Sequence, residues 1–361
     1  MEILETLGLC NPAEPRHIVE LLSGNIWIVV DDNLYGIDRR GLGRMLIEED
    51  LERVTPAEKK AVEDIKEAYG RAAHEVVIEV KDGHVKRVSA TPQYGEGAQI
   101  GNIPRSIGDL KWVEVLDLSN NELFDLPESI GNLTSLRELD LSENDITSLP
   151  ESIGNLASLV KLNISELGLT SLPESFGNLT SLQELIGYRV NVLRDTARLS
   201  SLPKSFGNLR SLTRFVLWRN KLKELPESFG DLGALVELDL YDNELSTLPE
   251  SIGHLGSLKK LDLSANNLKA LPASFGNLKA LEELKLAGNE LTTLPGFFAE
   301  LSSLWELDIS GKNLRPFPEI LLEIPCLKVL RMESWIGKMK PLDETAERVK
   351  KQLKDKGVKV N

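Results

Sequence analysis

The sequence predicts an α/β solenoid: short parallel strands line a concave face, a small α+β cap region precedes the repeats, and a helix caps the C-terminal end. Three observations lead to this fold class. A leucine pattern of 23 residues restarts nine times between residues 113 and 326. Residues 1–84 lack the pattern, and residues 341–361 follow a helical one. A chain of 361 residues therefore forms an elongated repeat array with different ends.

The repeat is defined by apolar residues at fixed spacings. Each unit opens with Leu-x-x-Leu-x-Leu and continues through Asn and Leu-Pro to an Ile/Phe-Gly-Asn-Leu segment, as in residues 136–156. Eight units have 23 residues, and the unit that starts at Leu182 has 30. The nine units start at Val113, Leu136, Leu159, Leu182, Leu212, Leu235, Leu258, Leu281 and Leu304, and a partial copy starts at Leu327.

Each part of the unit favours its own local structure. The alternating leucines predict a short strand with one buried face. The Asn at the ninth position suits a buried turn in which its amide bonds backbone groups. Proline ends the extended segment, and the apolar pair after it predicts a brief helical or 3₁₀ return. One unit cannot bury its own leucines, so the units must stack.

The pattern resembles the leucine-rich repeat family over residues 113–326, about 59% of the chain. The Leu-Pro-Glu-Ser-Ile/Phe-Gly-Asn-Leu half is similar to the intracellular Ras-associated class of plants, animals and fungi. The resemblance implies a right-handed horseshoe with a parallel concave sheet that binds a folded protein partner. It also implies that this partner is a small GTPase or another signalling protein.

Residues 1–84 read as α+β. Residues 25–30 and 34–37 predict two strands around a turn, and Thr55-Pro56-Ala57-Glu58 is a capping box that opens a helix to about Tyr69. Residues 76–80 and 85–88 predict a hairpin that leads into the repeats. We interpret residues 1–84 as a cap; the alternative is a module with an enzymatic or sensing activity, for which the repeats recruit substrate.

The remaining boundaries follow from the repeat. Residues 85–340 form the solenoid, with an irregular unit at 85–112, regular units at 113–326 and a partial unit at 327–340. Residues 341–361 predict a capping helix and a tail, because apolar residues recur at helical spacing before Gly357. The apolar stripe consists of Leu342, Ala346, Val349 and Leu353.

Composition excludes several function classes. The net charge of −14 argues against binding to a phosphate backbone, so we expect no nucleic-acid partner. The chain has no apolar run of membrane-spanning length, and residues 1–22 do not read as a secretory signal. The only cysteines, Cys10 and Cys326, make no disulfide framework. We therefore expect a cytoplasmic protein, a monomer, with a protein partner.

Residues that could carry catalysis are scattered. The four histidines have no spacing for zinc or for a nucleophile and its base, and no phosphate-binding loop or nucleophile elbow occurs. The repeated Glu of Leu-Pro-Glu-Ser is more simply a solvated convex edge. We expect no enzyme, no cofactor and no metal.

The candidate site is a cluster on the concave face. The seventh position of a unit carries Ser or Ala in most units but an aromatic residue in three adjacent ones, beside arginines and an acidic column. Tyr, Trp and Arg are the residue types of interface hot spots. The predicted partner-binding residues are Ile186, Tyr188, Arg189, Arg214, Val216, Trp218, Arg219, Asp239, Tyr241 and Asp262.

The cluster coincides with the long unit, whose extra residues fall in 186–198. Insertions in repeats commonly map to a binding rim, and the alternative is that the insertion packs on the protein itself under the aromatic residues. The register of Tyr188 decides its direction, because a shift of one residue turns a side chain to the opposite face.

Overall fold

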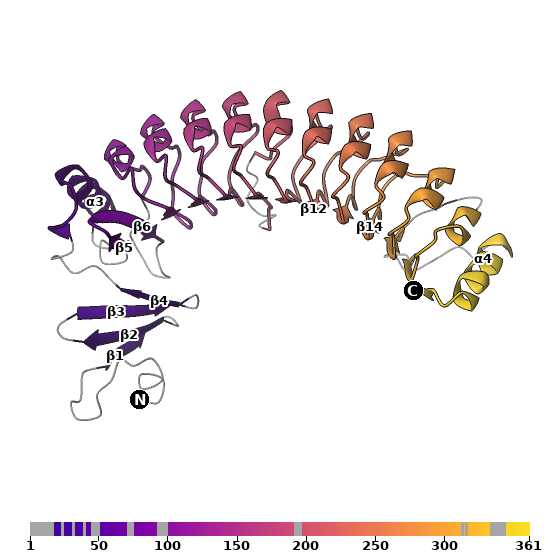
Figure 1. Cartoon of the computed structure of the whole chain (residues 1–361), viewed down its shortest axis with the longest axis horizontal. Helices are drawn as coiled ribbons and strands as arrows, with labels where there is room; N and C mark the ends of the chain where they lie inside the picture. The colour runs from indigo at the N-terminus through magenta and orange to yellow at the C-terminus, as the bar shows by residue number, and fades with distance from the viewer. Residues whose placement is uncertain are drawn as a thin grey trace.

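A computed structural model of the chain forms a curved array of stacked repeat units, with strands along the inner edge and 3₁₀ helices along the outer edge (Figure 1). This is the predicted fold class, a leucine-rich solenoid of horseshoe shape. The structure describes residues 18–22, 25–30, 33–38, 41–44, 51–70, 76–91, 100–190, 197–311, 314, 317–332 and 344–361, with side chains from residue 51 onward.

The inner edge is one sheet of 13 strands in the described part of the chain, in strictly sequential order. Every neighbouring pair from β6 to β17 is parallel, and only β5 and β6 pair antiparallel. The strands are β5 Val76–Lys81, β6 His84–Ala90, β7 Val115–Asp117, β8 Glu138–Asp140, β9 Lys161–Asn163, β10 Glu184–Ile186, β11 Arg214–Val216, β12 Glu237–Asp239, β13 Lys260–Asp262, β14 Glu283–Lys285, β15 Glu306–Asp308, β16 Val329–Arg331 and β17 Lys359–Val360.

The outer edge is a row of 3₁₀ helices, each of which follows a Leu-Pro step or its equivalent. They are η2 Arg105–Asp109, η3 Glu128–Asn132, η4 Glu151–Asn155, η5 Glu174–Asn178, η6 Lys204–Asn208, η7 Glu227–Asp231, η8 Glu250–His254, η9 Ala273–Asn277, η10 Gly296–Glu300 and η11 Glu319–Leu322. Each begins after an extended proline, as the sequence predicts.

Close stacking explains the glycine of the outer row. A Cβ atom on Gly207 would lie 2.0 Å from the backbone oxygen of Ser228 in the next unit, and one on Gly154 would lie 2.3 Å from that of Ser175. No side chain fits at such a distance. The repeated Glu also joins neighbouring units, because the Glu250 carboxylate accepts from the amide of Ser274, 3.2 Å away.

The core lies between the two edges and consists of the leucines of every unit, which are almost fully buried. Phenylalanines replace Ile in the middle units and stack along the solenoid, with ring centroids 6.3 Å apart for Phe176 and Phe206 and 5.9 Å apart for Phe206 and Phe229.

The ninth-position Asn forms the buried turn that the sequence predicts. The Asn144 amide donates to the carbonyls of Leu118 (2.9 Å) and Leu141 (2.8 Å) and accepts from the amide of Leu123 (3.0 Å). One side chain thus satisfies backbone groups of two units, which would otherwise be buried without partners.

The N-terminal region contains two sets of elements. β1 Ile18–Leu22, β2 Asn25–Val30, β3 Asn33–Asp38 and β4 Gly41–Arg44 form an antiparallel sheet of their own. The predicted strands at 25–30 and 34–37 correspond to β2 and β3; β1 and β4 were not predicted.

Helix α3 Pro56–Tyr69 has the predicted capping box and joins the core of the solenoid. Ser106 of η2 donates to the Asp64 carboxylate (2.6 Å), and the Tyr69 hydroxyl donates to Asn121 (2.8 Å). The hairpin of β5 and β6 belongs to the solenoid sheet, so the expected boundary between residues 84 and 85 cuts a continuous sheet.

At the other end, helix α4 Glu344–Asp355 buries Ala346, Val349 and Leu353, as the helical stripe predicts. Leu342, the fourth residue of that stripe, lies outside the described residues. The chain then adds β17 parallel to β16, an element that the sequence analysis did not predict.

Candidate ligand-binding surface

Charged side chains at the third position of the units from β8 to β15 form a ladder across the concave sheet. Glu138 pairs with Lys161 (3.3 Å), and the Arg214 guanidinium pairs with both Glu184 (2.6 Å) and Glu237 (3.3 Å). Neighbouring strands in register bring these side chains together. The ladder neutralises much of the acidic face that the sequence predicts, and Arg214 is engaged within it.

The fifth position has a structural role in regular units. Its Asp accepts a hydrogen bond from the backbone amide of the seventh residue, as in Asp140 to Ser142 (2.9 Å) and Asp308 to Ser310 (2.8 Å). A carboxylate that accepts an amide two residues ahead holds the end of the strand in place.

Two adjacent units depart from this arrangement. Ile186 and Val216 replace the Asp, and the seventh-position residues Tyr188 and Trp218 stack with ring centroids 4.8 Å apart and an interplanar angle of 6°. The Arg219 guanidinium lies 5.4 Å from the Trp218 ring and pairs with Asp242 (3.5 Å). Such contacts are typical of aromatic and cation–π pairs.

The register of Tyr188 is that of the regular units. Its carbonyl accepts from the amide of Glu166 (3.0 Å), and the amide of Arg189 donates to the Trp218 carbonyl (3.3 Å). We call the half-buried residues Ile186, Tyr188, Trp218 and Tyr241 the aromatic patch. Asp239, Asp262, Arg214 and Arg219 border it and are also half-buried.

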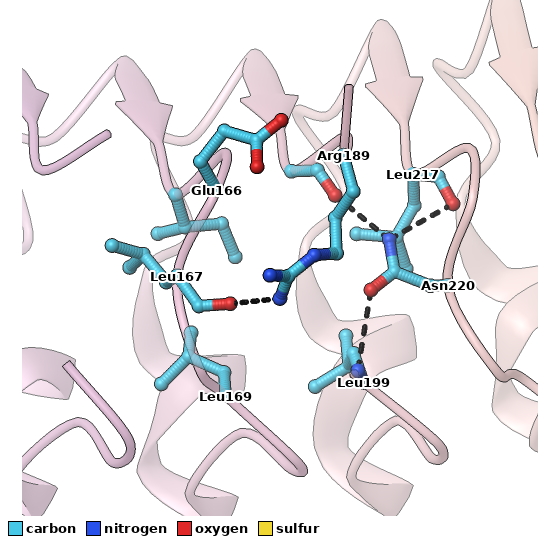
Figure 2. Close-up of a pocket in the computed structure, with 9 residues that line it drawn as sticks. Glu166, Leu167, Leu169, Arg189, Leu199, Leu217 and Asn220 are labelled. Atoms are coloured by element: carbon cyan, nitrogen blue, oxygen red, sulfur yellow. Dashed lines mark hydrogen bonds between the residues drawn. The ribbon is translucent and has the colours of Figure 1, made fainter. Parts of the chain in front are cut away.

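Two of the predicted site residues are buried. Val216 is only 4% exposed, and its short side chain lies in register between Ile186 and Asp239. Arg189 is also 4% exposed and points into the interior (Figure 2). These two residues are corrections to the predicted site.

Arg189 faces inward because this unit has a different turn. The described eighth residues of the other regular units, such as Arg219 (φ 59°) and Asp242 (φ 54°), adopt a positive φ, and Arg189 does not. The unit carries Val190 where others carry the turn Asn. The Arg189 guanidinium instead donates to the carbonyls of Leu167 and of Ala197 (2.8 Å), so a charged group takes over backbone bonding in the turn.

The sequence analysis missed this interior substitution, although the sequence carries a signal for it. The units that start at Leu159 and Leu182 both lack the turn Asn, and Gly187 replaces the core Leu of the second one. A Cβ atom there would lie 2.7 Å from the Leu217 side chain and 3.0 Å from that of Ile164, so these two neighbours fill the space. Asn220 of the next unit bonds the Gly187 carbonyl (2.8 Å) and restores the regular turn.

Asp239 is the electrostatically unusual carboxyl of the surface. Burial raises its pKa from 3.8 to about 6, and the nearby charge of Asp262 adds to the increase. Asp262 itself pairs with Lys285 (3.1 Å), and this neighbouring carboxylate together with Asp239 raises the pKa of the Lys285 ammonium against the effect of its burial.

Other site types have no counterpart in the described ranges. No three His, Cys, Asp or Glu side chains come together as a metal site there. None of the helices in those ranges has the length and apolar composition that a membrane span needs. Residues 191–196, the centre of the predicted insertion, lie outside the described residues.

Comparison with known protein families agrees with the repeat fold described above. The profile of the leucine-rich repeat region family matches residues 104–196 and 237–355, more than half of the chain. The chain belongs to the leucine-rich repeat family. A search of curated protein sequences finds no match to this leucine-rich repeat protein.

Among solved structures, the protein is similar to plant receptors with bound peptide ligands. It is 29% identical to the plant peptide hormone receptor RGFR1 in complex with RGF2 (TM-score 0.51, covering 65% of this chain and 42% of the receptor). It is 26% identical to PEPR1 in its complex with AtPEP1 (TM-score 0.53, 71% and 43%).

A third similar structure is the ectodomain of the Arabidopsis thaliana receptor kinase GASSHO1/SCHENGEN3 in complex with CASPARIAN STRIP INTEGRITY FACTOR 2 (26% identity, TM-score 0.51, 73% and 38%). The chain spans about two fifths of the length of these receptors. RGFR1 and GASSHO1/SCHENGEN3 are receptors, and all three structures are complexes.

Proposed function

We propose that this leucine-rich repeat protein is a non-catalytic scaffold that binds a folded protein partner on its concave face, with the aromatic patch as the anchor. The observation that carries the proposal is the Tyr188–Trp218 stack, which is half-buried on the concave face where two units lose the Asp of the fifth position. Large aromatic side chains at the centre of a face bordered by ion pairs are typical of binding hot spots.

For the identity of the partner, we propose a cytoplasmic signalling protein, with a small GTPase as the first candidate. The similarity of the repeat to the Ras-associated class supports this choice. We propose that the scaffold acts as a monomer. We propose that residues 1–84 cap the N-terminal end of the solenoid, because the buried residues of α3 belong to the same hydrophobic core as those of the solenoid.

The test uses the full chain as bait. The double variant Trp218→Ala/Tyr241→Ala should lose capture of its specific partner, since removal of a hot-spot residue costs about 2 kcal/mol or more of binding free energy. Its melting temperature should fall by less than about 4 °C, because half-buried surface residues contribute little to stability.

The matched control is Trp112→Ala, which removes an exposed tryptophan outside the aromatic patch, 49% accessible to solvent. It should capture the same partner as the unaltered chain. Identical capture profiles for all three proteins would refute the patch. For the GTPase, the purified candidate loaded with GDP or with a GTP analogue is titrated against the chain; the absence of binding in both states refutes that assignment.

A further inference from the structure

Asp239 and Tyr241 are neighbouring outward-facing residues of the β12 unit, and each lacks the partner that its counterparts have. Among the described residues, Asp239 accepts a bond only from the Tyr241 amide (3.0 Å) and forms no ion pair. The counterpart Asp262 pairs with Lys285 (3.1 Å), and Asp140 accepts from the Asn163 amide group (3.0 Å). The second carboxylate oxygen of Asp239 is therefore available to a ligand.

Tyr241 is the aromatic residue of the patch whose ring does not stack on another described ring. Tyr188 and Trp218 stack on each other, and the Tyr241 ring contacts no other described ring. Its hydroxyl makes no hydrogen bond to a described residue. Residues two apart on a strand point to the same face and lie about 6.6 Å apart, so a planar cation over this ring can reach the Asp239 carboxylate.

The local charge also favours a cation. Arg214 forms ion pairs with two glutamates, Glu184 and Glu237. These three side chains therefore carry one uncompensated negative charge. Arg219 is engaged with Trp218 and Asp242. These described cations around β12 thus pair with other groups, and Lys285, which pairs with Asp262, acts on Asp239 only through its nearby charge.

We infer that this part of the concave face recognises one arginine side chain of the partner, whose guanidinium packs on the Tyr241 ring and pairs with the Asp239 carboxylate. The inference rests on the proposed function, which it deepens by naming the chemistry of the contact. A guanidinium fits both groups, because its plane stacks on aromatic faces and its edge donates to a carboxylate.

The state of Asp239 makes this recognition depend on pH. Burial holds its pKa near 6, so the carboxylate is formed at pH 7.5 and is largely lost at pH 5. The charged groups that face it are Glu237 on its own strand, Arg214 on β11, Lys260 and Asp262 on β13, and Lys285 on β14. Arginine binding should weaken about tenfold from pH 7.5 to pH 5, as the carboxylate becomes scarce.

The experiment titrates the full chain, labelled with ¹⁵N at its tryptophan indoles, with the capped peptide Gly-Leu-Arg-Leu-Gly and with the same peptide carrying citrulline. The Trp218 indole signal, assigned with Trp218→Phe, reports binding next to the patch. The arginine peptide should shift this signal and the citrulline peptide should not. Equal shifts with both peptides would overturn the inference.

Matched variants separate the site from general attraction to an acidic protein. Asp239→Asn should weaken binding of the arginine peptide about tenfold and abolish its pH dependence. Asp308→Asn changes the net charge equally, at a position with the same backbone bond to Ser310 (2.8 Å), and should weaken it by less than about twofold. Equal losses in the two variants would overturn the inference.

Tyr241→Ser places at this position the residue that Ser264 provides in the next unit, and should weaken binding severalfold. Different results would refute the arginine site and the scaffold function. If the Trp218→Ala/Tyr241→Ala variant loses its partner but Asp239→Asn binds the arginine peptide normally, the scaffold function stands and the arginine site is wrong.

Discussion

The outer and inner edges of the solenoid differ in how far their units depart from one another. Along the outer edge, units from η2 to η8 place glycine against the backbone of the next serine, at distances of 2.0–2.6 Å that no side chain allows. Along the inner edge, the units that end in η3 to η8 carry Asp, Asn, Ile or Val at the fifth position and Ser, Tyr or Trp at the seventh. Packing dictates the first set, and solvent-facing positions leave the second set open to binding.

The break in the repeat extends from the inner edge into the turn beneath it. Regular units close the turn with one buried Asn, whereas the long unit closes it with the Arg189 guanidinium. Tyr188 of the aromatic patch directly precedes Arg189 in the chain. The stacking of units therefore determines the fold, and the departures from the repeat coincide with the candidate site.

The largest expected loss of stability comes from a substitution at the outer edge. Gly207→Ala should lower the free energy of unfolding by about 3 kcal/mol or more, because its Cβ atom would lie 2.0 Å from the Ser228 oxygen and force two units apart. Gly233→Ala is the control, since no atom lies within 4 Å of its Cβ position, and should change stability by less than about 1 kcal/mol. Urea unfolding measures both, and similar values would break the comparison.

The next effect compares the two kinds of turn. Asn243→Ala removes bonds to the carbonyls of Leu217 (3.0 Å) and Leu240 (3.1 Å) and from the amide of Leu222 (3.1 Å), and should cost about 3 kcal/mol. Arg189→Met removes the donor to the buried Leu167 carbonyl and to the Ala197 carbonyl and should cost about 2 kcal/mol. A stability unchanged by Arg189→Met would show that the guanidinium does not close the turn.

Much of the fold could be predicted because it depends on local periodicity. The alternating leucines gave the strands, Leu-Pro gave the 3₁₀ returns, Thr55 and Glu58 gave the start of α3, and the stripe at Ala346 gave α4. Strands β1, β4 and β17 depend on pairing with distant or weakly patterned segments, so no periodicity within them indicated their formation.

The positions within the repeat that form the candidate site could be predicted from the sequence, but the orientation and burial of every residue at them could not. Counting positions placed Tyr188 and Trp218 side by side, because strand register is the same in every unit. The direction of Arg189 depends on a backbone φ that differs from that of the other eighth residues, and the burial of Val216 depends on the size of its neighbours. Neither property follows from the spacing of leucines.

A smaller effect on stability is expected from the carboxyl group of Asp239 on the inner edge. The raised pKa of Asp239, about 6 against 3.8 in the unfolded chain, means that the folded state binds a proton more tightly. The resulting destabilisation is full above pH 6 and disappears as the pH falls toward 4. Asp239→Asn should therefore raise the free energy of unfolding by about 1–2 kcal/mol at pH 7.5 and by less at pH 5.

Urea titrations of both proteins at the two pH values measure this difference. An equal gain for Asp239→Asn at pH 7.5 and pH 5 would contradict a half-buried carboxylate without an ion pair at this position.

The smallest expected effect concerns the aromatic stack itself. Tyr188→Ser, which gives this unit the residue that most units carry at the seventh position, should lower the free energy of unfolding by only about 1 kcal/mol, the contribution of one aromatic pair. Thermal unfolding measures it. A loss as large as that of Gly207→Ala would mean that the patch is part of the structural core and is not a free surface.

The most direct test of the central claim is a hydroxyl-radical footprint of the chain with and without its captured partner, read by mass spectrometry at each aromatic residue. The account predicts that Tyr188, Trp218 and Tyr241 become protected in the complex while the exposed Trp112 keeps its reactivity. Protection at Trp112, with the three patch residues as reactive as in the free chain, would contradict it.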